Sequence, residues 1–416
     1  MRRRNFFRIT GIGALLPVIL EGYSCGTTVK DSFQLINTPE KRAIYLKKML
    51  AALSTDIGPH PSGSLEYDLA AQIVEDEFRR VLPVVQRDTY TFDYWKLNGE
   101  PVFQVGEQKL HAIPAHGTSG TPTEGITGIL VKNEGSIVYI IVDPSTGEKL
   151  ARVAISESWA TGLAVARPWT MYDKDPGGLP TFNLAKMDIP ALEDAVKAKI
   201  PVFAQSLVEF VPGSRSSSII GKLPGKSTDE LVFFAHLDTV FCSPGANDNT
   251  ASLIVILMLA QAISTSKPDK TITFIATAGE EYGWMGTKHL AQVWNDNGTL
   301  DRIRLMVNFD SLTWGPVLTV GTRDEDLCTL IATIIEEKNI PLEMIIRDMD
   351  GLGREAQPFK DSGISARGVV VDSNGPVEIR SVWHRPDDTA EKVDEKLVEY
   401  NYLLFNEFIR RVQKFL

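Results

Sequence analysis

Residues 271–287 read "TITFIATAGEEYGWMGT", an apolar run that ends in a glycine-rich turn with two adjacent carboxylates, Glu280 and Glu281. The apolar and β-branched residues over 272–276 predict a buried strand. Glutamate is common where a strand meets solvent, so the pair alone indicates no particular chemistry. Its meaning depends on what the rest of the chain brings to the same place.

Apolar strands alternate with helical patterns through the second half of the chain. This alternation is typical of a sheet that is covered by helices. We therefore predict an α/β fold with a mixed, largely parallel sheet flanked by helices. The expected strands are 216–223, 230–236, 271–278, 302–310 and 366–372, and the expected helices are 251–263, 328–338 and 393–416.

The first half of the chain has a different texture. Two stretches with helical spacing come first, and short β-rich runs follow from about residue 99. We predict an inserted small α+β domain at 96–205, within a discontinuous catalytic domain of residues 31–95 and 206–416. The leading helices are expected at 39–53 and 67–82; inside the insertion, strands are expected at 128–131 and 137–142, and helices at 146–156 and 189–198.

The N-terminus is typical of an export signal over residues 1–25. Arginines at positions 2, 3, 4 and 8 precede an apolar run, 9–20, that is too short to span a bilayer. The stretch "RRNFFR" resembles a twin-arginine signal, with Sec export as the alternative. Cys25 lies where a lipoprotein cysteine is expected, although the usual leucine three residues before it is missing. We expect a periplasmic or cell-envelope lipoprotein, or an extracellular protein.

The net charge indicates the class of binding partner, and the cysteine content bears on disulfide pairing. The formal net charge is −10, the pI is near 5.3 and no long basic stripe is present, which argues against a nucleic-acid partner and favours peptides or small molecules. Apart from Cys25, the chain has only Cys242 and Cys328. Their spacing does not determine whether they pair, and buried free thiols are the default interpretation.

Metal-ligand residue types follow several of the apolar runs. His236 and Asp238 end one expected strand, Asp310 ends another, Asp248 opens the most apolar helix, and His384 precedes a proline-containing turn. Each has an ordinary explanation, such as a core histidine or a helix cap. Ligands of such sheets lie beyond the carboxyl ends of the strands, however, and an unpaired buried carboxylate costs several kcal/mol. A metal centre accounts for all of them together.

The charges favour two divalent ions. Asp248, Glu281 and Asp310 contribute about −3 against about +4 for two ions, and a bound hydroxide would neutralise the remainder. If Asp248 bridges, one zinc is bound by His236, Asp248 and Asp310, and the other by Asp248, Glu281 and His384. Each ion then has three protein ligands and one open position, which is typical of a catalytic site.

Two further carboxylates have expected roles beside these ligands. Glu280 would act as general base, taking a proton from the metal-bound water and returning it to the leaving amine. Asp238 would accept the second ring N–H of His236 and so fix the imidazole. The alternative for Asp238 is a surface charge at a strand end.

These residues lie in five motifs that resemble those of the co-catalytic zinc aminopeptidases, over about 40–95 and 206–416. The resemblance implies a zinc-exopeptidase, phosphorylase/hydrolase-like fold, shared with glutamate carboxypeptidases and glutaminyl cyclases, and implies the ligand roles above. The insertion resembles a protease-associated domain. A related acylase clan carries a long lid domain after the glutamate pair, but only residues 282–309 separate Glu281 from Asp310 here. The motifs are "AHLDTV", "GANDNTAS", "GEEYGWMGT", "NFD" and "HRPDDT".

One departure from the family pattern affects substrate binding. Many relatives have "SDH" where this chain reads "REA" at 354–356, which makes Glu355 a candidate for holding the substrate amine. A solvent-exposed loop charge is the preferred interpretation of Glu355. Trp383 stands where relatives often have a tyrosine that steadies the oxyanion, so it is a second candidate substrate contact. Structural or surface roles are expected for His60, His111, His116 and His289.

The sequence therefore predicts an exported di-zinc metallopeptidase, above all an aminopeptidase that acts on peptide substrates through a water or hydroxide bridging two zinc ions. A glutaminyl cyclase-type aminoacyltransferase with one zinc and a carboxypeptidase of the same fold remain alternatives. A non-catalytic binding module is disfavoured because no ligand is missing. A serine hydrolase is disfavoured because no G-x-S-x-G elbow is present.

Overall fold

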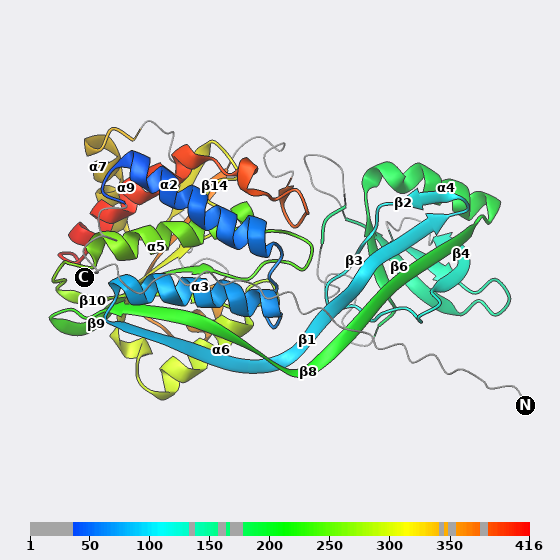
Figure 1. Cartoon of the computed structure of the whole chain (residues 1–416), viewed down its shortest axis with the longest axis horizontal. Coiled ribbons are helices and arrows are strands. Elements are labelled where there is room, and N and C mark those ends of the chain that lie inside the picture. Colours follow the sequence, from blue (N-terminus) through cyan, green and yellow to red (C-terminus); the bar gives the residue numbers. More distant parts are fainter. Residues whose placement is uncertain are drawn as a thin grey trace, which may run out of the picture.

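The structure is a computed structural model that describes residues 36–132, 138–156, 164–166, 178–340, 345–347, 355–374 and 382–416. The expected export signal at 1–25, with Cys25, lies outside the described residues, as does position 354 of the stretch "REA". Two lobes are joined by two long strands, and the larger lobe holds the helices α2, α3, α5 and α9 (Figure 1).

The described strands form one 14-stranded sheet. In the larger lobe the order is β13-β12-β14-β11-β9-β10-β8, with β1 on the outside of β8. The strand β9 pairs in parallel with β10 and β11, and β11 pairs in parallel with β14, whereas β10 with β8 and β12 with β14 are antiparallel. The predicted mixed, largely parallel sheet is confirmed here. The strands are β9 Ser227–His236, β10 Lys270–Thr277, β11 Ile303–Phe309, β12 Val317–Gly321, β13 Ile345–Arg347 and β14 Arg367–Asn374.

Helices cover both faces of this part of the sheet. One face carries a core built with α2, α3, α5, α7 and α9, and the other carries a smaller core with α6 and α8. The predicted helices at 39–53, 67–82, 251–263, 328–338 and 393–416 are confirmed, with shifted ends. The helices are α2 Pro39–Leu50, which continues as the π-helix η1 Ala51–Ile57, α3 Leu65–Val81, α5 Ala251–Ile263, α6 Met285–Asp296, α7 Glu325–Glu337, α8 Gln357–Asp361 and α9 Glu395–Val412, with short η4 Ala246–Thr250, η5 Leu300–Arg302 and η7 Ala390–Lys392.

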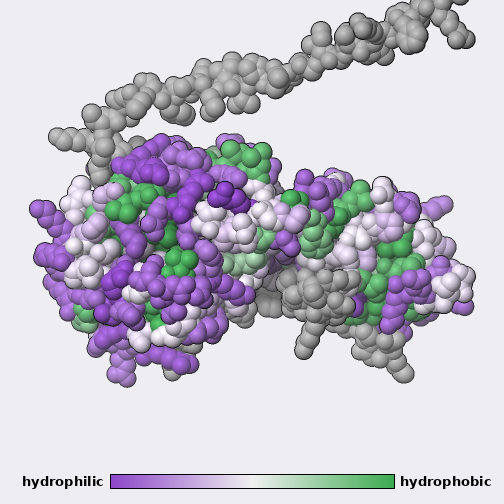
Figure 2. All heavy atoms as spheres, turned by 90° about the horizontal axis from the view of Figure 1, so that it is seen from below, coloured by the Kyte–Doolittle hydropathy of each residue, from purple (hydrophilic) through white to green (hydrophobic). Residues whose placement is uncertain are grey.

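Helix α5 has apolar residues on all sides, and the rest of the protein surrounds it on all sides. Within the described residues, the segment Ala246–Ile263 is the one helix long and apolar enough to cross a membrane, but 94% of it is buried inside the protein. The exposed surface has the opposite character. On the face shown in Figure 2, hydrophilic residues cover most of the larger lobe and hydrophobic residues form small separate patches.

The long strands β1 Val84–Val105 and β8 Pro201–Leu223 pair antiparallel and run through both lobes (Figure 1). The sequence did not predict this continuity, because the polar residues along them gave no clear strand pattern. Their pairing shifts register between Phe92 and Tyr94 and again between Asn98 and Val102. Such irregularities bend and twist a ribbon. A bent ribbon, and not a pair of linkers, therefore joins the lobes, and the boundaries at 95/96 and 205/206 stay a prediction.

The smaller lobe has its own apolar core around Phe103, Tyr139 and Phe182. The predicted helix at 146–156 is wrong, because 149–155 forms the strand β6, which pairs with β5 on one side and with β7 on the other. The predicted helix at 189–198 is confirmed. The elements are β2 Gln108–Leu110, β3 Ile113–Pro114, β4 Ile126–Lys132, β5 Val138–Val142, β6 Lys149–Ile155, β7 Thr181–Leu184, η3 Lys186–Asp188 and α4 Ile189–Ala198.

Candidate metal centre

Three neighbouring parallel strands deliver the candidate ligands to one edge of the sheet. His236 is the last residue of β9 and lies opposite Thr277, the last residue of β10. The glutamate pair follows β10, and Asp310 follows β11 directly. Because β9 lies between β10 and β11, and all three run in the same direction, their carboxyl ends meet.

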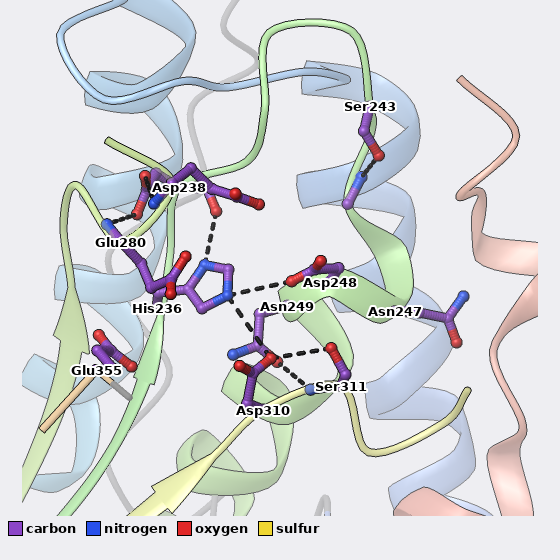
Figure 3. A network of polar contacts seen from close by, with 12 residues as sticks. His236, Asp238, Ser243, Asn247, Asp248, Asn249, Glu280, Asp310, Ser311 and Glu355 are labelled. Atoms are coloured by element: carbon purple, nitrogen blue, oxygen red, sulfur yellow. Dashed lines mark hydrogen bonds and ion pairs between the residues drawn. The ribbon is translucent and has the colours of Figure 1, made fainter. Parts of the chain in front are cut away.

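Asp248 lies between the two histidines. It sits in η4, the turn that opens α5, with a non-helical backbone. Its Oδ1 lies 3.2 Å from His236 Nε2, and its Oδ2 lies 3.6 Å from His384 Nε2. The two oxygens of one carboxylate thus face two different imidazoles, which is the arrangement that a bridging ligand needs. Figure 3 shows Asp248, His236 and Asp310 pointing toward one another.

The other two carboxylates complete two groups of three. Asp310 Oδ1 lies 3.8 Å from His236 Nε2, and Glu281 Oε2 lies 3.1 Å from His384 Nε2. Within each group, one ligand atom from every residue lies within 4.8 Å of the others, and Asp248 belongs to both groups. The structure therefore brings together the five residues that the sequence singled out, in the same two sets.

The electrostatics of the cluster fit bound cations. Burial would lower the pKa of His384, but Glu281 and Asp248 raise it to about 9. Burial would also lower the pKa of His236, yet Asp248 and Asp310 raise it well above its usual range. Without ions, the buried carboxylates thus hold protons on both imidazoles. Divalent cations at the same position would supply that charge and leave the imidazoles neutral, as metal ligands must be.

Main-chain carbonyls orient both histidines. His236 Nδ1 donates to the carbonyl oxygen of Asp238 at 2.9 Å, and His384 Nδ1 donates to that of Ala166 at 2.8 Å. A carbonyl can only accept, so the proton sits on Nδ1 and Nε2 is left to bind a metal. The expectation that the Asp238 carboxylate accepts from His236 is wrong, because the main chain of the same residue takes that place.

The Asp238 carboxylate instead holds the glutamate pair. It is fully buried and accepts from the backbone N–H of Glu280 at 3.1 Å and of Glu281 at 3.3 Å. Burial raises the pKa of Asp238 to about 7. Its role is therefore to fix the turn that carries the pair, and the alternative of a surface charge is wrong.

The two adjacent glutamates have different environments. Burial raises the pKa of both side chains, but His384 lowers that of Glu281 below its ordinary value. For Glu280 the effect of burial prevails, and its pKa lies well above the ordinary range. Glu280 Oε1 accepts from Trp284 Nε1 at 3.0 Å, and the side chain lies beside His236 (Figure 3). One glutamate is therefore suited to bind a cation, and the other to accept and release a proton.

Two residues that position the ligands were missed from the sequence. Asp388 is fully buried and accepts from the backbone N–H of Asn247 and Asp248, at 2.9 and 3.1 Å, and from the Asn247 side chain at 2.7 Å. Asn249 donates to Phe309 O at 2.9 Å and accepts from Ser311 N at 3.1 Å, which ties the Asp248 turn to the end of β11. Asn249 lies in the motif "GANDNTAS" and Asp388 in the motif "HRPDDT", so these motifs were the sequence feature from which both residues could have been identified.

The interpretation of Glu355 as a solvent-exposed charge is wrong. It is 2% exposed, accepts from the Thr277 hydroxyl, and burial raises its pKa to about 7. Trp383 stacks on His384, with 4.0 Å between ring centroids, so it lies against a candidate ligand. His60 is buried, His116 packs on Tyr282, and His289 lies 3.6 Å from Asp88, as structural roles predict. Cys242 and Cys328 are partly buried thiols that form no disulfide with each other.

The model of peptidase family M28 matches residues 218–409, which include all five candidate ligands and Glu280. Over these residues, which make up less than half of the chain, the sequence is similar to peptidase family M28. Aminopeptidase YwaD of Bacillus subtilis is 25% identical over 236 residues, or 53% of this chain and 49% of that protein. The leucine aminopeptidase 2 of Trichophyton equinum is 26% identical over 34% of this chain and 29% of its own length. The chain thus spans less than half of these curated relatives.

Solved structures match the fold of this chain over most of its length, which includes both lobes. A peptidase M28 precursor from Shewanella amazonensis matches with a TM-score of 0.74 at 17% identity, over 92% of this chain and 96% of that one. A zinc aminopeptidase from Bacillus subtilis matches with a TM-score of 0.68 at 19% identity, over 88% and 93%. A glutaminyl cyclase from an Acidobacteriales bacterium also matches, with a TM-score of 0.51 at 14% identity, over 91% and 95%. Similarity of fold therefore leaves the reaction to be argued from the site.

Proposed function

We propose that this chain is a zinc-dependent aminopeptidase that removes N-terminal residues from peptides, with two zinc ions per chain. The observation that carries the proposal is the placement of Asp248, whose two oxygens face His236 and His384. The family match and the names of the relatives, which are aminopeptidases, support the same reaction. One ion would be held by His236, Asp248 and Asp310, and the other by Asp248, Glu281 and His384.

The chain supplies proton transfer and positioning. Bound at these donors, zinc would provide Lewis acidity toward the scissile carbonyl and a water molecule. Glu280 takes the proton of the attacking water and returns it to the leaving amine, since burial keeps its pKa above that of an ordinary glutamate. Asp238 and Asp388 hold the two turns that carry the ligands. The export signal, the lipid anchor at Cys25 and the protease-associated character of the insertion remain predictions.

Chromogenic peptides with free and acetylated N-termini test this proposal. We expect the purified protein to cleave aminoacyl substrates, to lose cleavage after chelation, and to regain it with zinc at two ions per chain by elemental analysis. N-acetylation should abolish cleavage. Equal cleavage of acetylated peptides that have a free carboxylate would identify a carboxypeptidase instead, and cyclisation of an N-terminal glutamine without hydrolysis would identify a glutaminyl cyclase.

Glu355 is expected to hold the substrate's ammonium group. Its Oε2 is buried and has no hydrogen-bond partner among the described residues, and a buried carboxylate of this kind needs a cation or a donor. In the variant Glu355→Gln, kcat/KM for aminoacyl substrates should fall by roughly ten- to a hundredfold, mainly through KM, because a charged hydrogen bond contributes about 1.5–3 kcal/mol. Zinc content should not change.

The matched control for this variant is Glu336→Gln, which makes the same substitution at an exposed position of α7. Steady-state kinetics on both variants separates a local effect from a general one. Unchanged kcat/KM in Glu355→Gln would show that the ammonium group binds elsewhere.

A further inference from the structure

We propose that the insertion is part of the metal centre: residues 164–166 clamp His384, so that affinity at the Asp248–Glu281–His384 cluster depends on the docking of the smaller lobe. The inference rests on the proposed function only in taking the cluster to bind zinc.

The first contact is a reciprocal pair of hydrogen bonds. Ala166 N donates to His384 O at 3.2 Å, and His384 Nδ1 donates to Ala166 O at 2.8 Å. The insertion therefore holds both the backbone and the ring of this ligand. His384 has a φ of 55°, in the left-handed region that a non-glycine residue adopts at a cost unless its surroundings enforce it. The two bonds to Ala166 supply that enforcement.

The second contact comes from the neighbouring residue. Arg385 Nη1 donates to Ala164 O at 2.6 Å, and Arg385 is 4% exposed. Its Nη2 also bonds to Asp387 at 3.1 Å, which balances the charge of the guanidinium. Separating a buried arginine from the main-chain carbonyl to which it donates costs free energy, because the charged group is then left without a partner. This bond therefore holds the insertion against the turn after His384.

The third contact is an apolar seam between the lobes. Ile113, Ala164 and Ala166 of the insertion pack with Val240 of the larger lobe, two residues after Asp238. Phe241 and Cys242 pack against the same cluster. Residues 164–166 are fully buried, so the hydrogen bonds to His384 and Arg385 form in a place from which water is excluded.

In the described part of the chain, no residue of the insertion bonds to the other histidine, His236. His236 Nδ1 bonds to the carbonyl of Asp238, two residues along its own chain, and β9 is paired on both sides within the larger lobe. Among the described residues, the Asp310-containing cluster is thus held by the larger lobe, whereas in the Glu281-containing cluster the carbonyl that orients the histidine belongs to Ala166 of the insertion. Loosening the clamp should weaken one ion and spare the other.

Zinc titration of the full-length, metal-free protein tests the proposal. In Arg385→Met, which keeps side-chain length and removes the bond to Ala164, we expect one of two binding steps to weaken by roughly ten- to a hundredfold, as for other partners that orient a ligand. His384→Ala identifies the step that belongs to this cluster. Arg385→Lys, which keeps one donor, should restore part of the affinity.

Arg410→Met is the matched control, because Arg410 also donates to a main-chain carbonyl, that of Ala262, but at an exposed position far along α9. It should bind both ions like the parent. If Arg385→Met does not fold, as judged by circular dichroism, Ile113→Ala loosens the same seam from the insertion side and should weaken the same step.

Parental affinities for both ions in Arg385→Met, or equal weakening of both steps, would overturn the proposal. Failure of the proposed function would look different. A parent chain that binds two zinc ions without cleaving peptides would refute the aminopeptidase and leave the titration as a valid test of the clamp. A parent chain that binds no second ion would refute both.

Discussion

Replacing Glu280 with glutamine is expected to lower kcat by roughly 10²- to 10⁴-fold, the contribution typical of a general base. Glutamine has the same shape, and its amide oxygen can still accept from Trp284 Nε1, which lies 3.0 Å from Glu280 Oε1. It cannot take a proton from water at neutral pH. The zinc content and KM should therefore stay close to those of the parent. Steady-state kinetics together with elemental analysis provides the measurement.

The neighbouring Glu281→Gln variant makes this prediction specific. Glu281 faces His384 at 3.1 Å and belongs to one of the two ligand groups, so its loss should reduce metal affinity as well as rate. Of the two adjacent glutamates, Glu280 would then affect the rate alone, whereas Glu281 would affect both the rate and the metal affinity. Glu66→Gln, an exposed position on α3, serves as the control and should change neither quantity. Loss of zinc in Glu280→Gln would mean that Glu280 is a ligand, and a parental kcat would remove it from the mechanism.

The second large effect is expected for Asp248→Asn. An asparagine has one oxygen and one NH₂ group, so it cannot face both His236 and His384 with an acceptor. The chain should then hold no more than one tightly bound zinc. Since a metal contributes several kcal/mol to the transition state, kcat/KM should fall by roughly a thousandfold or more. Elemental analysis after dialysis, with kinetics on the same sample, measures both changes.

Thermal unfolding distinguishes this effect from misfolding. In the metal-free protein Asp248 is buried beside Glu281 and Asp310, and burial raises its pKa. Removing its charge relieves the repulsion from Glu281 and Asp310 but also removes the attraction to His236 and His384, so the melting temperature of the metal-free variant should stay close to that of the metal-free parent. The increase in melting temperature on adding zinc should shrink, because stabilisation follows the affinity of the native state. Two bound zinc ions in Asp248→Asn would contradict the bridging role.

The fold could be predicted from the sequence where a residue pattern is compatible with only one type of secondary structure. The apolar runs that became β9, β10 and β11 are buried on both sides, so they could be recognised without alternation. The long ribbon of β1 and β8 could not, because polar residues on its surface carry little strand signal. Residues 146–156 were mistaken for a helix for a related reason. Their side chains are compatible with both the helical and the strand spacing, and they form a strand because β5 and β7 pair with them on either side.

By itself, the sequence determined the identity of the five donor side chains, of the extra glutamate, and of the strands that carry them. Parallel strands place their carboxyl ends together whatever the rest of the chain does. Only the tertiary structure decided that Glu355 is buried, that the Asp238 carboxylate holds a turn, and that Ala166 orients His384. The physical reason is that every residue has a main-chain carbonyl and N–H, so which of them becomes a partner depends on packing and leaves no mark in the order of side chains.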